Sequence, residues 1–387
     1  MTQRSIPVDA LIIGAGMVGL GVALGLAQKG QRVVVVAPHD RPQLTPKTRL
    51  RVSALNIASR QWLTDLAVWQ HVDSAEIGPY SAMEVWDHDS FGQIAFAADG
   101  VRYQDLGAIV ENVRVEQALW QQAEQAGVEF INSSDWERQP QADGNALLQV
   151  ESRSYAPTVL IGADGARSSL RQQSGLPVIE WPYEQRGLVG IIETAKPHNG
   201  CCYQVFLPSG PLALLPLADP HQCSIVWSLD NGEYATVSGY SDSQLGHAIQ
   251  AATGQRLGAT QWLSERAQFP LHALYAKRWV EGNTVLVGDA AHSVHPLAGQ
   301  GANLGLADAK QLVAALTDEA GELNRRLRAY ERSRKTAAMS LLTAMEAFKR
   351  GFGTRNPVIK ALRGIGFNSV NHLPSIKQKF MRRALGF

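Results

Sequence analysis

A glycine-rich turn near the start of the chain constrains the fold most. The apolar run VDALII at 8–13 leads into GAGMVG at 14–19, and a helical pattern then continues to Gln28 before RVVVV at 32–36. The pattern GxGxxG is weak alone, but inside a strand–helix–strand unit it predicts a dinucleotide-binding site. Such units build open α/β sheets, so we expect a Rossmann-like domain.

Each of the three glycines in this turn has its own expected role. Gly14 makes the tight turn, Gly16 lets the backbone approach a pyrophosphate, and Gly19 lets the helix pack closely on the strand. The motif therefore predicts that a dinucleotide pyrophosphate lies at the start of this helix.

The second strand of the unit departs from the usual pattern at its end. That position usually carries Asp or Glu, whose carboxylate binds the ribose hydroxyls. Here it is Ala37, with His39 and Asp40 close behind. Either of these two residues, or another part of the chain, is therefore expected to hold the ribose.

A second glycine-rich stretch, GDAAHSVHPLAGQGANLGLADAK at 288–310, follows the short apolar run NTVLV at 283–287. Asp289 stands at the carboxyl end of this predicted strand, where open α/β sheets bind their ligands. Small and apolar residues then recur at helical spacing, so we expect a helix that opens at 299–301. A helix start attracts anionic groups, and the stretch predicts a pocket for one end of a large cofactor.

Between these two stretches lie a third motif and the signs of a second sheet. The run TVLIGADGARSSLR at 158–171 places Asp164 at the end of a strand, although an Asp-Gly pair alone is only a turn. Residues 80–105 alternate and turn at 89–92, which is typical of a hairpin, and residues 179–229 hold four apolar runs separated by turns. We therefore expect an antiparallel sheet.

Composition excludes several classes of protein. The 387 residues are 45% hydrophobic and 18% charged, which is typical of a globular chain of two or three domains. The three cysteines lack metal-ligand spacing and are expected to be small buried apolar residues. No apolar run approaches the ~20 residues of a membrane-spanning helix, and no signal peptide is evident, so the expected location is the cytoplasm. A net charge of +1 gives no reason to expect nucleic acid as a partner.

The three motifs, in their order and spacing, resemble those of the single-component flavin aromatic hydroxylases, which are built like p-hydroxybenzoate hydroxylase. Within that group, the segments RVSALN, YSAMEVWDHDSFGQIAF, GAIVENVRVEQALW and YERSRK resemble the ubiquinone-biosynthesis hydroxylases. The part MEVWDHDSFG is most similar to the branch that hydroxylates ring carbon C5 of a 2-polyprenylphenol. The similarity covers nearly the whole chain.

The resemblance implies an α/β fold with three parts. A discontinuous Rossmann-like FAD-binding domain would comprise 1–75, 106–178 and 281–345. An antiparallel β-sheet substrate domain would comprise 76–105 and 179–280, and a basic C-terminal helical region would comprise 346–387.

The resemblance also implies which residues bind FAD. Gly14, Gly16 and Gly19 would contact the pyrophosphate, and Asp289 would bind the ribityl chain. Arg51 and Asp164 would lie near the cofactor. The residues beside the isoalloxazine would be Pro296, Gly299, Gln300, Gly301 and Ala302.

In such enzymes reduced flavin and O2 form a flavin hydroperoxide, which transfers oxygen to an electron-rich phenol. The protein positions the ring and excludes water. The sequence identifies no catalytic base: His292 and His295 are expected beside the flavin, either as structural residues or in proton transfer, and a metal pair is the weakest interpretation. Electrons would come from NAD(P)H or from a separate reductase.

Three rival functions stay open at this point. The chain could be a sister hydroxylase that acts at another ring position, because such enzymes share every flavin motif. It could be a flavin-dependent reductase or dehydrogenase of the same fold. It could also be a prenyl-binding protein without redox activity, although the intact late motif argues against this.

Two further expectations concern the substrate. Its pocket should lie between the flavin and the antiparallel sheet, where Phe206, Leu215 and Trp227 are candidates for the wall or for the core. From 347 onward the chain carries nine Lys or Arg and no Asp or Glu. This basic tail, Lys349 to Arg383, is expected either to pack as a helical region or to contact anionic lipid at the inner membrane, or a partner of a ubiquinone-biosynthesis complex.

Overall fold

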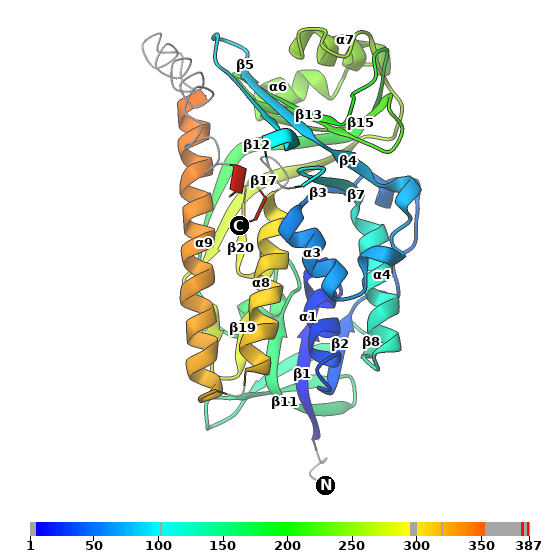
Figure 1. The fold of residues 1–387 in the computed structure, drawn as a ribbon. Coiled ribbons are helices and arrows are strands. Elements are labelled where there is room, and N and C mark those ends of the chain that lie inside the picture. The colour runs from blue at the N-terminus through cyan, green and yellow to red at the C-terminus, as the bar shows by residue number, and fades with distance from the viewer. Residues whose placement is uncertain are drawn as a thin grey trace.

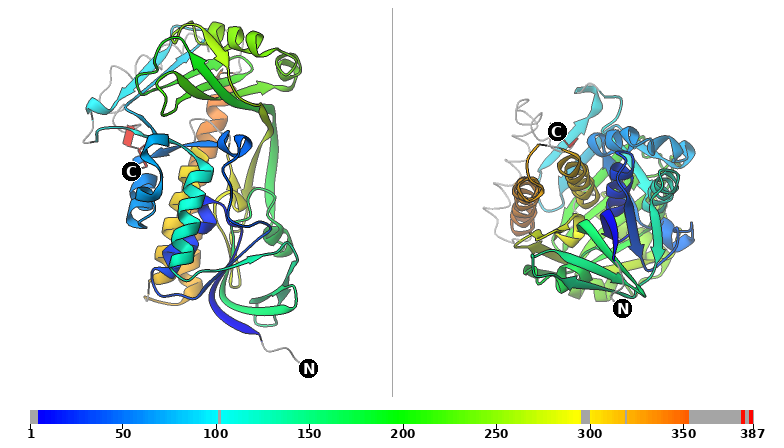
Figure 2. Two further views of the ribbon diagram at one scale, coloured as in Figure 1. Left: turned by 90° about the vertical axis from the view of Figure 1, so that its right-hand side faces the viewer. Right: turned by 90° about the horizontal axis from the view of Figure 1, so that it is seen from below.

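The computed structural model describes residues 5–100, 103–294, 300–318, 320–352, 381–382 and 385–386. Two sheets dominate these residues, one below the other in Figure 1, with helices against the lower sheet and two shorter helices on top of the upper sheet. The turned views in Figure 2 show the same two layers side on and from below.

The lower sheet has eight strands, and its central path runs β18-β19-β11-β1-β2-β8. The pairs β1 with β2, β1 with β11, β11 with β19 and β2 with β8 are all parallel, which confirms the expected open α/β sheet. The strands are β1 (Ile6–Ile13), β2 (Val33–Ala37), β8 (Glu129–Asn132), β9 (Trp136–Pro140), β10 (Ala146–Val150), β11 (Arg153–Gly162), β18 (Val280–Glu281) and β19 (Thr284–Leu286).

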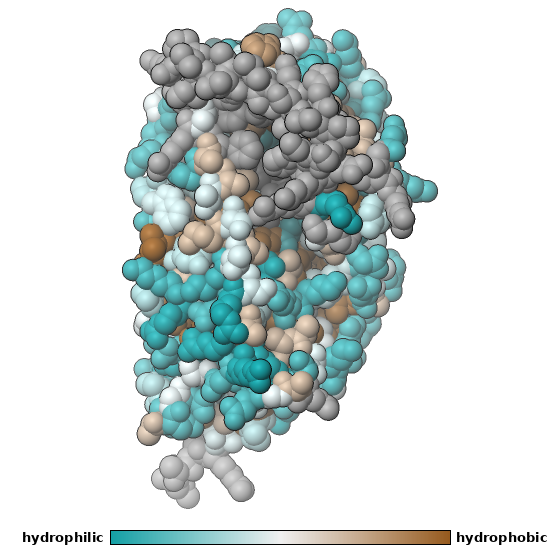
Figure 3. Space-filling view, turned by 60° about the vertical axis from the view of Figure 1, so that its left-hand side comes forward, coloured by the Kyte–Doolittle hydropathy of each residue, from teal (hydrophilic) through white to brown (hydrophobic). Residues whose placement is uncertain are grey.

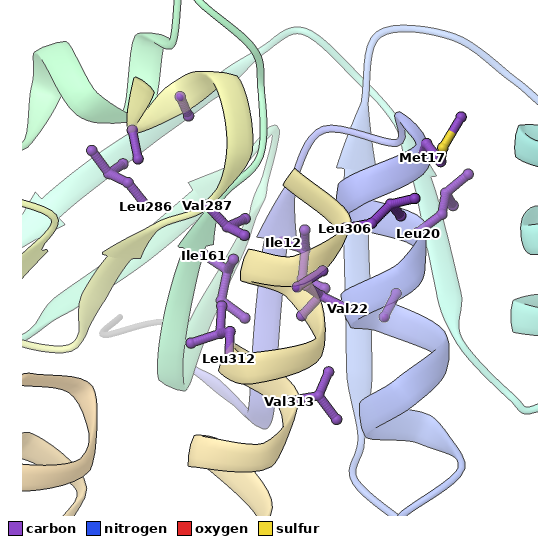
Figure 4. Packing of buried hydrophobic residues seen from close by; sticks show 14 of the residues in the cluster. Ile12, Met17, Leu20, Val22, Ile161, Leu286, Val287, Leu306, Leu312 and Val313 are labelled. Atoms are coloured by element: carbon purple, nitrogen blue, oxygen red, sulfur yellow. The ribbon is translucent and has the colours of Figure 1, made fainter. Parts of the chain in front are cut away.

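Helices α1 (Met17–Ala27) and α8 (Gln300–Thr317) pack together against this sheet. Figure 4 shows side chains of β1, β11, β19, α1 and α8 meeting in one apolar cluster. The contact is close, because a Cβ placed on Gly25 of α1 would lie 2.9 Å from Val313 of α8. The other helices around the sheet are α3 (Ile57–Asp65), α4 (Asn112–Gln125) and α9 (Leu323–Phe352), and α2 (Pro46–Arg49) and α5 (Ser169–Gln173) are short.

The upper sheet has nine strands in the order β20-β17-β12-β15-β14-β13-β5-β6, with β16 paired to β12. Its pairs are antiparallel except for β13 with β5. The expected hairpin is confirmed as β5 and β6. The strands are β5 (Ala82–Asp87), β6 (Gln93–Ala97), β12 (Val178–Thr194), β13 (Cys201–Leu207), β14 (Gly210–Pro216), β15 (Gln222–Asp230), β16 (Thr260–Trp262), β17 (Ala267–Ala276) and β20 (His292–Ser293).

Helices α6 (Asn231–Val237) and α7 (Asp242–Ala252) cover the far face of the upper sheet (Figure 1). Their apolar residues share a core with strands β12 to β15, and this core includes Trp227 and Trp262. The three cysteines are buried and unpaired, as small apolar residues would be.

A small third sheet between the two layers was not expected from the sequence. It consists of β3 (Val52–Asn56), β4 (Gly78–Tyr80) and β7 (Gly107–Glu111) in the order β3-β7-β4. The helical pattern of VENVRVEQALWQQAEQA at 110–126 predicts a helix from Val110, whereas the strand continues to Glu111 and α4 begins one residue later. All five residues of β7 are buried, and a short apolar run of this kind has the same pattern in a strand and in a buried helix.

Most of the basic tail, including much of Lys349 to Arg383, lies outside the described residues. Helix α9 begins at Leu323, before the expected start of the C-terminal region at 346. Met381 and Leu385 are buried against residues of β3, β7 and β14. Figure 3 shows mainly hydrophilic side chains, with scattered apolar ones, over the described part of the face that carries α9. Among the described helices, none combines the length and apolar character needed to cross a membrane.

Candidate functional site

Three of the sequence motifs meet at one edge of the lower sheet. Because β1, β2, β11 and β19 run parallel, the residues that follow them lie together at their carboxyl ends. These are Gly14 after β1, Ala37 at the end of β2, Asp164 after β11 and Asp289 after β19. Gly14 and Asp289, which are 275 positions apart in the chain, therefore lie at one edge.

The three glycines of the first motif have different surroundings: Gly14 and Gly19 are tightly packed, whereas Gly16 leaves room for a ligand. Gly14 has a φ of +108°, and a Cβ there would lie 2.4 Å from the Ala163 carbonyl oxygen. A Cβ on Gly19 would lie 2.2 Å from the Gly14 oxygen, so this glycine lets α1 approach the turn. Gly16 has no atom within 4 Å of its Cβ position. Gly16 therefore opens onto free space at the amino end of α1, where a pyrophosphate would fit.

The middle motif contributes a carboxylate with a free acceptor. One oxygen of Asp164 accepts a hydrogen bond of 3.2 Å from the Leu170 backbone N–H. The other, Oδ1, is buried and has no hydrogen-bond partner within the described part of the chain. A buried acceptor of this kind is costly unless a ligand supplies the donor.

Arg171 joins the middle motif to the late motif. Its guanidinium is 3% exposed and donates 2.8 Å hydrogen bonds to the carbonyl oxygens of Ala290 and Ala166. No role could be predicted for this arginine from the sequence, because Ala290 becomes its neighbour only when the sheet has folded.

Asp289 keeps solvent access but is crowded by protein atoms. This desolvation raises the pKa of the Asp289 carboxyl, while the charges of His292 and Arg51 oppose the rise and Asp308 adds to it. Hydrogen bonds donated by the hydroxyl groups of a ligand would stabilise the ionised carboxylate. Its position suits the ribityl chain that the resemblance assigns to it.

A buried polar network anchors the turn that carries Asp289. His292 Nε2 lies 2.5 Å from Asp308 Oδ2, Arg334 Nε donates a 2.5 Å hydrogen bond to Asp308 Oδ1, and Gly288 N–H donates a 3.3 Å hydrogen bond to Asp308 Oδ2. His292 is 1% exposed and Asp308 is fully buried. The geometry favours the structural interpretation of His292, because its ring is already engaged with α8. Sequence reasoning missed Asp308 and Arg334.

His295, Pro296 and Gly299 lie outside the described residues. Gln300 begins α8, and Gly301 and Ala302 in its first turn are partly buried. Their expected contact with the isoalloxazine stays a prediction. Over the described ranges, no group of three His, Cys, Asp or Glu residues could hold a metal ion.

The first turn of α8 is fixed to the small sheet through Asn303. Its side chain accepts a 2.9 Å hydrogen bond from the Asn56 N–H and donates one of 2.8 Å to the Ala54 carbonyl. This residue stands in the late motif but was given no role from the sequence.

A cavity of about 180 Å³ lies between the small third sheet and the upper sheet. Arg51 and Asn112 line it on one side, and Leu215, Val226 and Phe269 line it on the other. The buried Oδ1 of Asn112 has no hydrogen-bond partner among the described residues. The wall is therefore apolar on the side of the upper sheet, whereas the opposite side combines Arg51 and Asn112 with the apolar residues Leu50, Val52 and Ala54.

One of the three candidate pocket residues lines this cavity. Leu215 does so, as expected. Phe206 is buried at 7% exposure but is absent from the lining, and Trp227 packs in the core under α6 and α7. Alternation along β15 explains the difference, because Val226 faces the cavity and its neighbour Trp227 must face away.

These features fit FAD. The open position at Gly16 and the unpartnered oxygen of Asp164 lie at the same edge of the lower sheet. Arg51 interacts electrostatically with Asp289 at this edge and also lines the cavity, together with the unpartnered oxygen of Asn112. A cofactor with a pyrophosphate and several hydroxyl groups has the anionic and donor groups that such a site lacks.

Comparison with known proteins agrees with this fit. Residues 7–345 match the family described as FAD binding domain. The chain is 31% identical to the 3-demethoxyubiquinol 3-hydroxylase of Escherichia coli (strain K12), covering 98% of this chain and 99% of that protein. It is 30% identical to the mitochondrial ubiquinone biosynthesis monooxygenase COQ6 of Drosophila melanogaster, over 98% and 90% of the two chains.

The fold is also that of solved monooxygenases. The p-nitrophenol 4-monooxygenase PnpA of Pseudomonas putida DLL-E4 superimposes with a TM-score of 0.77 over 98% of both chains, at 17% identity. At this identity the likeness shows the fold alone. Together with the family match and the two relatives, it shows that the chain belongs to the FAD-binding-domain family and is a FAD-dependent monooxygenase of the group that contains the ubiquinone-biosynthesis hydroxylases.

Proposed function

We propose that this enzyme hydroxylates the ring of a polyprenylated phenol in ubiquinone biosynthesis, with O2 as the source of oxygen. The observation that carries the proposal is the cavity between Arg51 and Leu215, which adjoins the FAD site and has an apolar wall. The names of the E. coli and Drosophila relatives support the pathway.

The size of the cavity supports a substrate that enters by its ring. At about 180 Å³ it is smaller than the roughly 300–1,000 Å³ of typical ligand pockets. A single aromatic ring fits such a volume, whereas a whole polyprenyl chain does not. Ala54, Ala213 and Leu215 line the cavity and also belong to an apolar cluster that contains Met381 and Leu385. A prenyl chain that left the ring on this side would meet apolar side chains.

The residues of the chain would then have distinct tasks. When bound, FAD supplies the redox chemistry that activates O2. Gly16 admits the pyrophosphate, Arg51 offsets its charge, and Asp164 and Asp289 accept hydrogen bonds from cofactor donors. Apolar residues such as Leu215 exclude water from the ring.

The ring position that we propose is C5, as the segment MEVWDHDSFG at 83–92 indicated. A rival position follows from the name of the E. coli relative, which is a 3-hydroxylase of a demethoxyubiquinol. The test is to supply the reduced, FAD-loaded enzyme with O2 and, separately, with a phenol that lacks the C5 oxygen and with a demethoxyubiquinol. Nuclear magnetic resonance of the products assigns the new hydroxyl group. Turnover of the demethoxyubiquinol alone would contradict C5.

The electron donor can be tested with the same protein. We propose that either NAD(P)H reduces the bound FAD directly or a separate reductase does so. Anaerobic mixing with NADH or NADPH, followed by the flavin absorbance, distinguishes the two. Bleaching within the turnover time supports direct reduction, and no bleaching supports a separate reductase.

We also propose that the basic tail contacts anionic lipid at the membrane where polyprenylated substrates reside, or an acidic partner of a biosynthetic complex. The support is the run of nine Lys or Arg without an acidic residue after position 346. Each cation near an anionic surface contributes about 1 kcal/mol, reduced by salt. Reversing several charges between Lys349 and Arg383 should weaken sedimentation with anionic liposomes while FAD content stays unchanged. Equal binding by both proteins across a salt series would refute the membrane contact.

A further inference from the structure

The end of β2 carries no group that could bind the ribose of FAD. Ala37 is 3% exposed, pairs with Asn132 of β8, and its carbonyl accepts a 2.9 Å hydrogen bond from Ser133 N–H. The carboxylate usual at this position is therefore replaced by a methyl group within the sheet edge. Another acceptor must be sought near the amino end of α1.

The two acceptors next in sequence are turned to other partners. Asp40 Oδ1 accepts a 2.9 Å hydrogen bond from the Asn132 side chain. His39 lies with its Nδ1 2.9 Å from the Asp40 carbonyl oxygen. Both residues are exposed in the loop that follows β2.

Helix α4 holds this loop against the site. Gln117 donates a 2.8 Å hydrogen bond to the Pro42 carbonyl, and Gln121 accepts one of 3.1 Å from Arg41. The ring of Trp120 lies 6.3 Å from that of His39. One face of α4 therefore borders the end of β2, although the two are about 80 residues apart in the chain.

Glu116 projects from this part of α4 to the glycine motif. Glu116 lies one helical turn after Asn112, which lines the cavity, and one turn before Trp120, whose ring lies near that of His39, on a helix that packs against α1. The side chain is half-buried, and desolvation raises the pKa of Glu116, while the charge of Arg51, the backbone of Met17 and the charge of His39 lower it. Glu116 thus places a carboxylate on the face of α4 that borders the end of β2, where an acidic residue at position 37 would otherwise supply one.

We propose that Glu116 binds the adenosine ribose hydroxyls of FAD, in place of an acidic residue at position 37. An ionised carboxylate has two oxygens with about four acceptor positions, which is enough for two hydroxyl donors. Helix α4 supplies the acceptor that β2 lacks. The bound hydroxyls would replace the water that keeps the partly buried charge solvated.

The test compares two ligands that differ only in the hydroxyls. ADP and 2′,3′-dideoxy-ADP carry the same pyrophosphate, and each is titrated into FAD-free protein by calorimetry. The variants are Glu116→Gln, which keeps the shape of the side chain, and Glu124→Gln, a matched control on α4 whose carboxylate accepts a 2.9 Å hydrogen bond from Trp120. FAD affinity is measured in parallel by quenching of flavin fluorescence.

We expect wild type and Glu124→Gln to bind ADP about tenfold or more tightly than the dideoxy form, since hydrogen bonds to a charged group are lost with the hydroxyls. Glu116→Gln should lose most of this preference and bind FAD correspondingly more weakly. The urea midpoint of the FAD-free variant checks that it is folded.

Four results would overturn the proposal. An unchanged preference in Glu116→Gln would exclude the residue, and loss of preference in Asp40→Asn instead would assign the ribose to that residue. An equal loss of affinity for both ligands would place the effect of Glu116 on the pyrophosphate. Tighter binding of both ligands would identify Glu116 as an anion that competes for the Met17 N–H.

Discussion

Alanine at two glycines of the first motif should have two different effects, one on FAD binding and the other on stability. In Gly16→Ala the new methyl group meets no protein atom within 4 Å, and the backbone there is extended, with a φ of −80°. In Gly19→Ala the methyl group would lie 2.2 Å from the Gly14 oxygen, a backbone atom that cannot turn away. We expect the first change to affect FAD binding and the second to affect the fold.

The magnitudes follow from these surroundings. Alanine instead of glycine at the start of a helix costs about 1 kcal/mol of stability, so FAD-free Gly16→Ala stays folded. Its methyl group enters the space that the pyrophosphate needs, and we expect at least about a tenfold loss of FAD affinity, or about 1.4 kcal/mol. For Gly19→Ala, overpacking costs about 1–3 kcal/mol, against a gain of up to about 1 kcal/mol from helix propensity.

Two measurements separate these effects. Urea unfolding of the FAD-free proteins, followed by circular dichroism, gives the stability, and quenching of flavin fluorescence gives the dissociation constant for FAD. Gly16→Ala should unfold close to wild type and bind FAD poorly, whereas Gly19→Ala should unfold at lower urea. If Gly16→Ala binds FAD as tightly as wild type, the placement of the pyrophosphate at this turn is refuted.

Three further changes test other parts of the site. Asp289→Asn should weaken FAD binding by about 1.5–3 kcal/mol, the value of hydrogen bonds to a charged group, as read by fluorescence titration. Because the folded state raises the pKa of Asp289, the FAD-free wild type should lose stability as pH rises through that pKa. FAD-free Asp289→Asn should lack this loss. The same pH dependence of the urea midpoint in both proteins would contradict this expectation. Asp308→Asn should lower the free energy of unfolding by about 3–5 kcal/mol, because Arg334 loses the buried negative charge that it pairs with. Unchanged urea unfolding would show that this network does not stabilise the fold. Leu215→Trp should fill the cavity and abolish ring hydroxylation while retaining FAD, and wild-type product yield would show that the ring binds elsewhere.

The parts of the site that the sequence predicted are those whose chemistry is local. Gly14 and Gly19 are needed because the turn and the helix approach each other within a few residues, and Asp164 and Asp289 follow strands that the apolar runs made visible. A parallel sheet then brings these strand ends together without further information.

The parts that were missed depend on contacts between distant elements. Glu116 and Asn112 lie on a helix whose pattern is that of any amphipathic helix, and they reach the site only because α4 packs against α1. Asp308 looked like one polar position among the small residues of α8, and its two side-chain partners come from β20 and α9. The end of strand β7 was predicted as helix, since a run of only five buried residues carries no decisive period.

Ring hydroxylation by O2 is the central claim, and isotope labelling tests it most directly. FAD-loaded enzyme is reduced under anaerobic conditions, mixed with a polyprenylphenol, and exposed to ¹⁸O2 in ordinary water. The account predicts a product that carries one ¹⁸O atom in a new ring hydroxyl group, as read by mass spectrometry. Flavin reoxidation that yields only hydrogen peroxide with every phenol tested, or a product oxygen that comes from water, would contradict it.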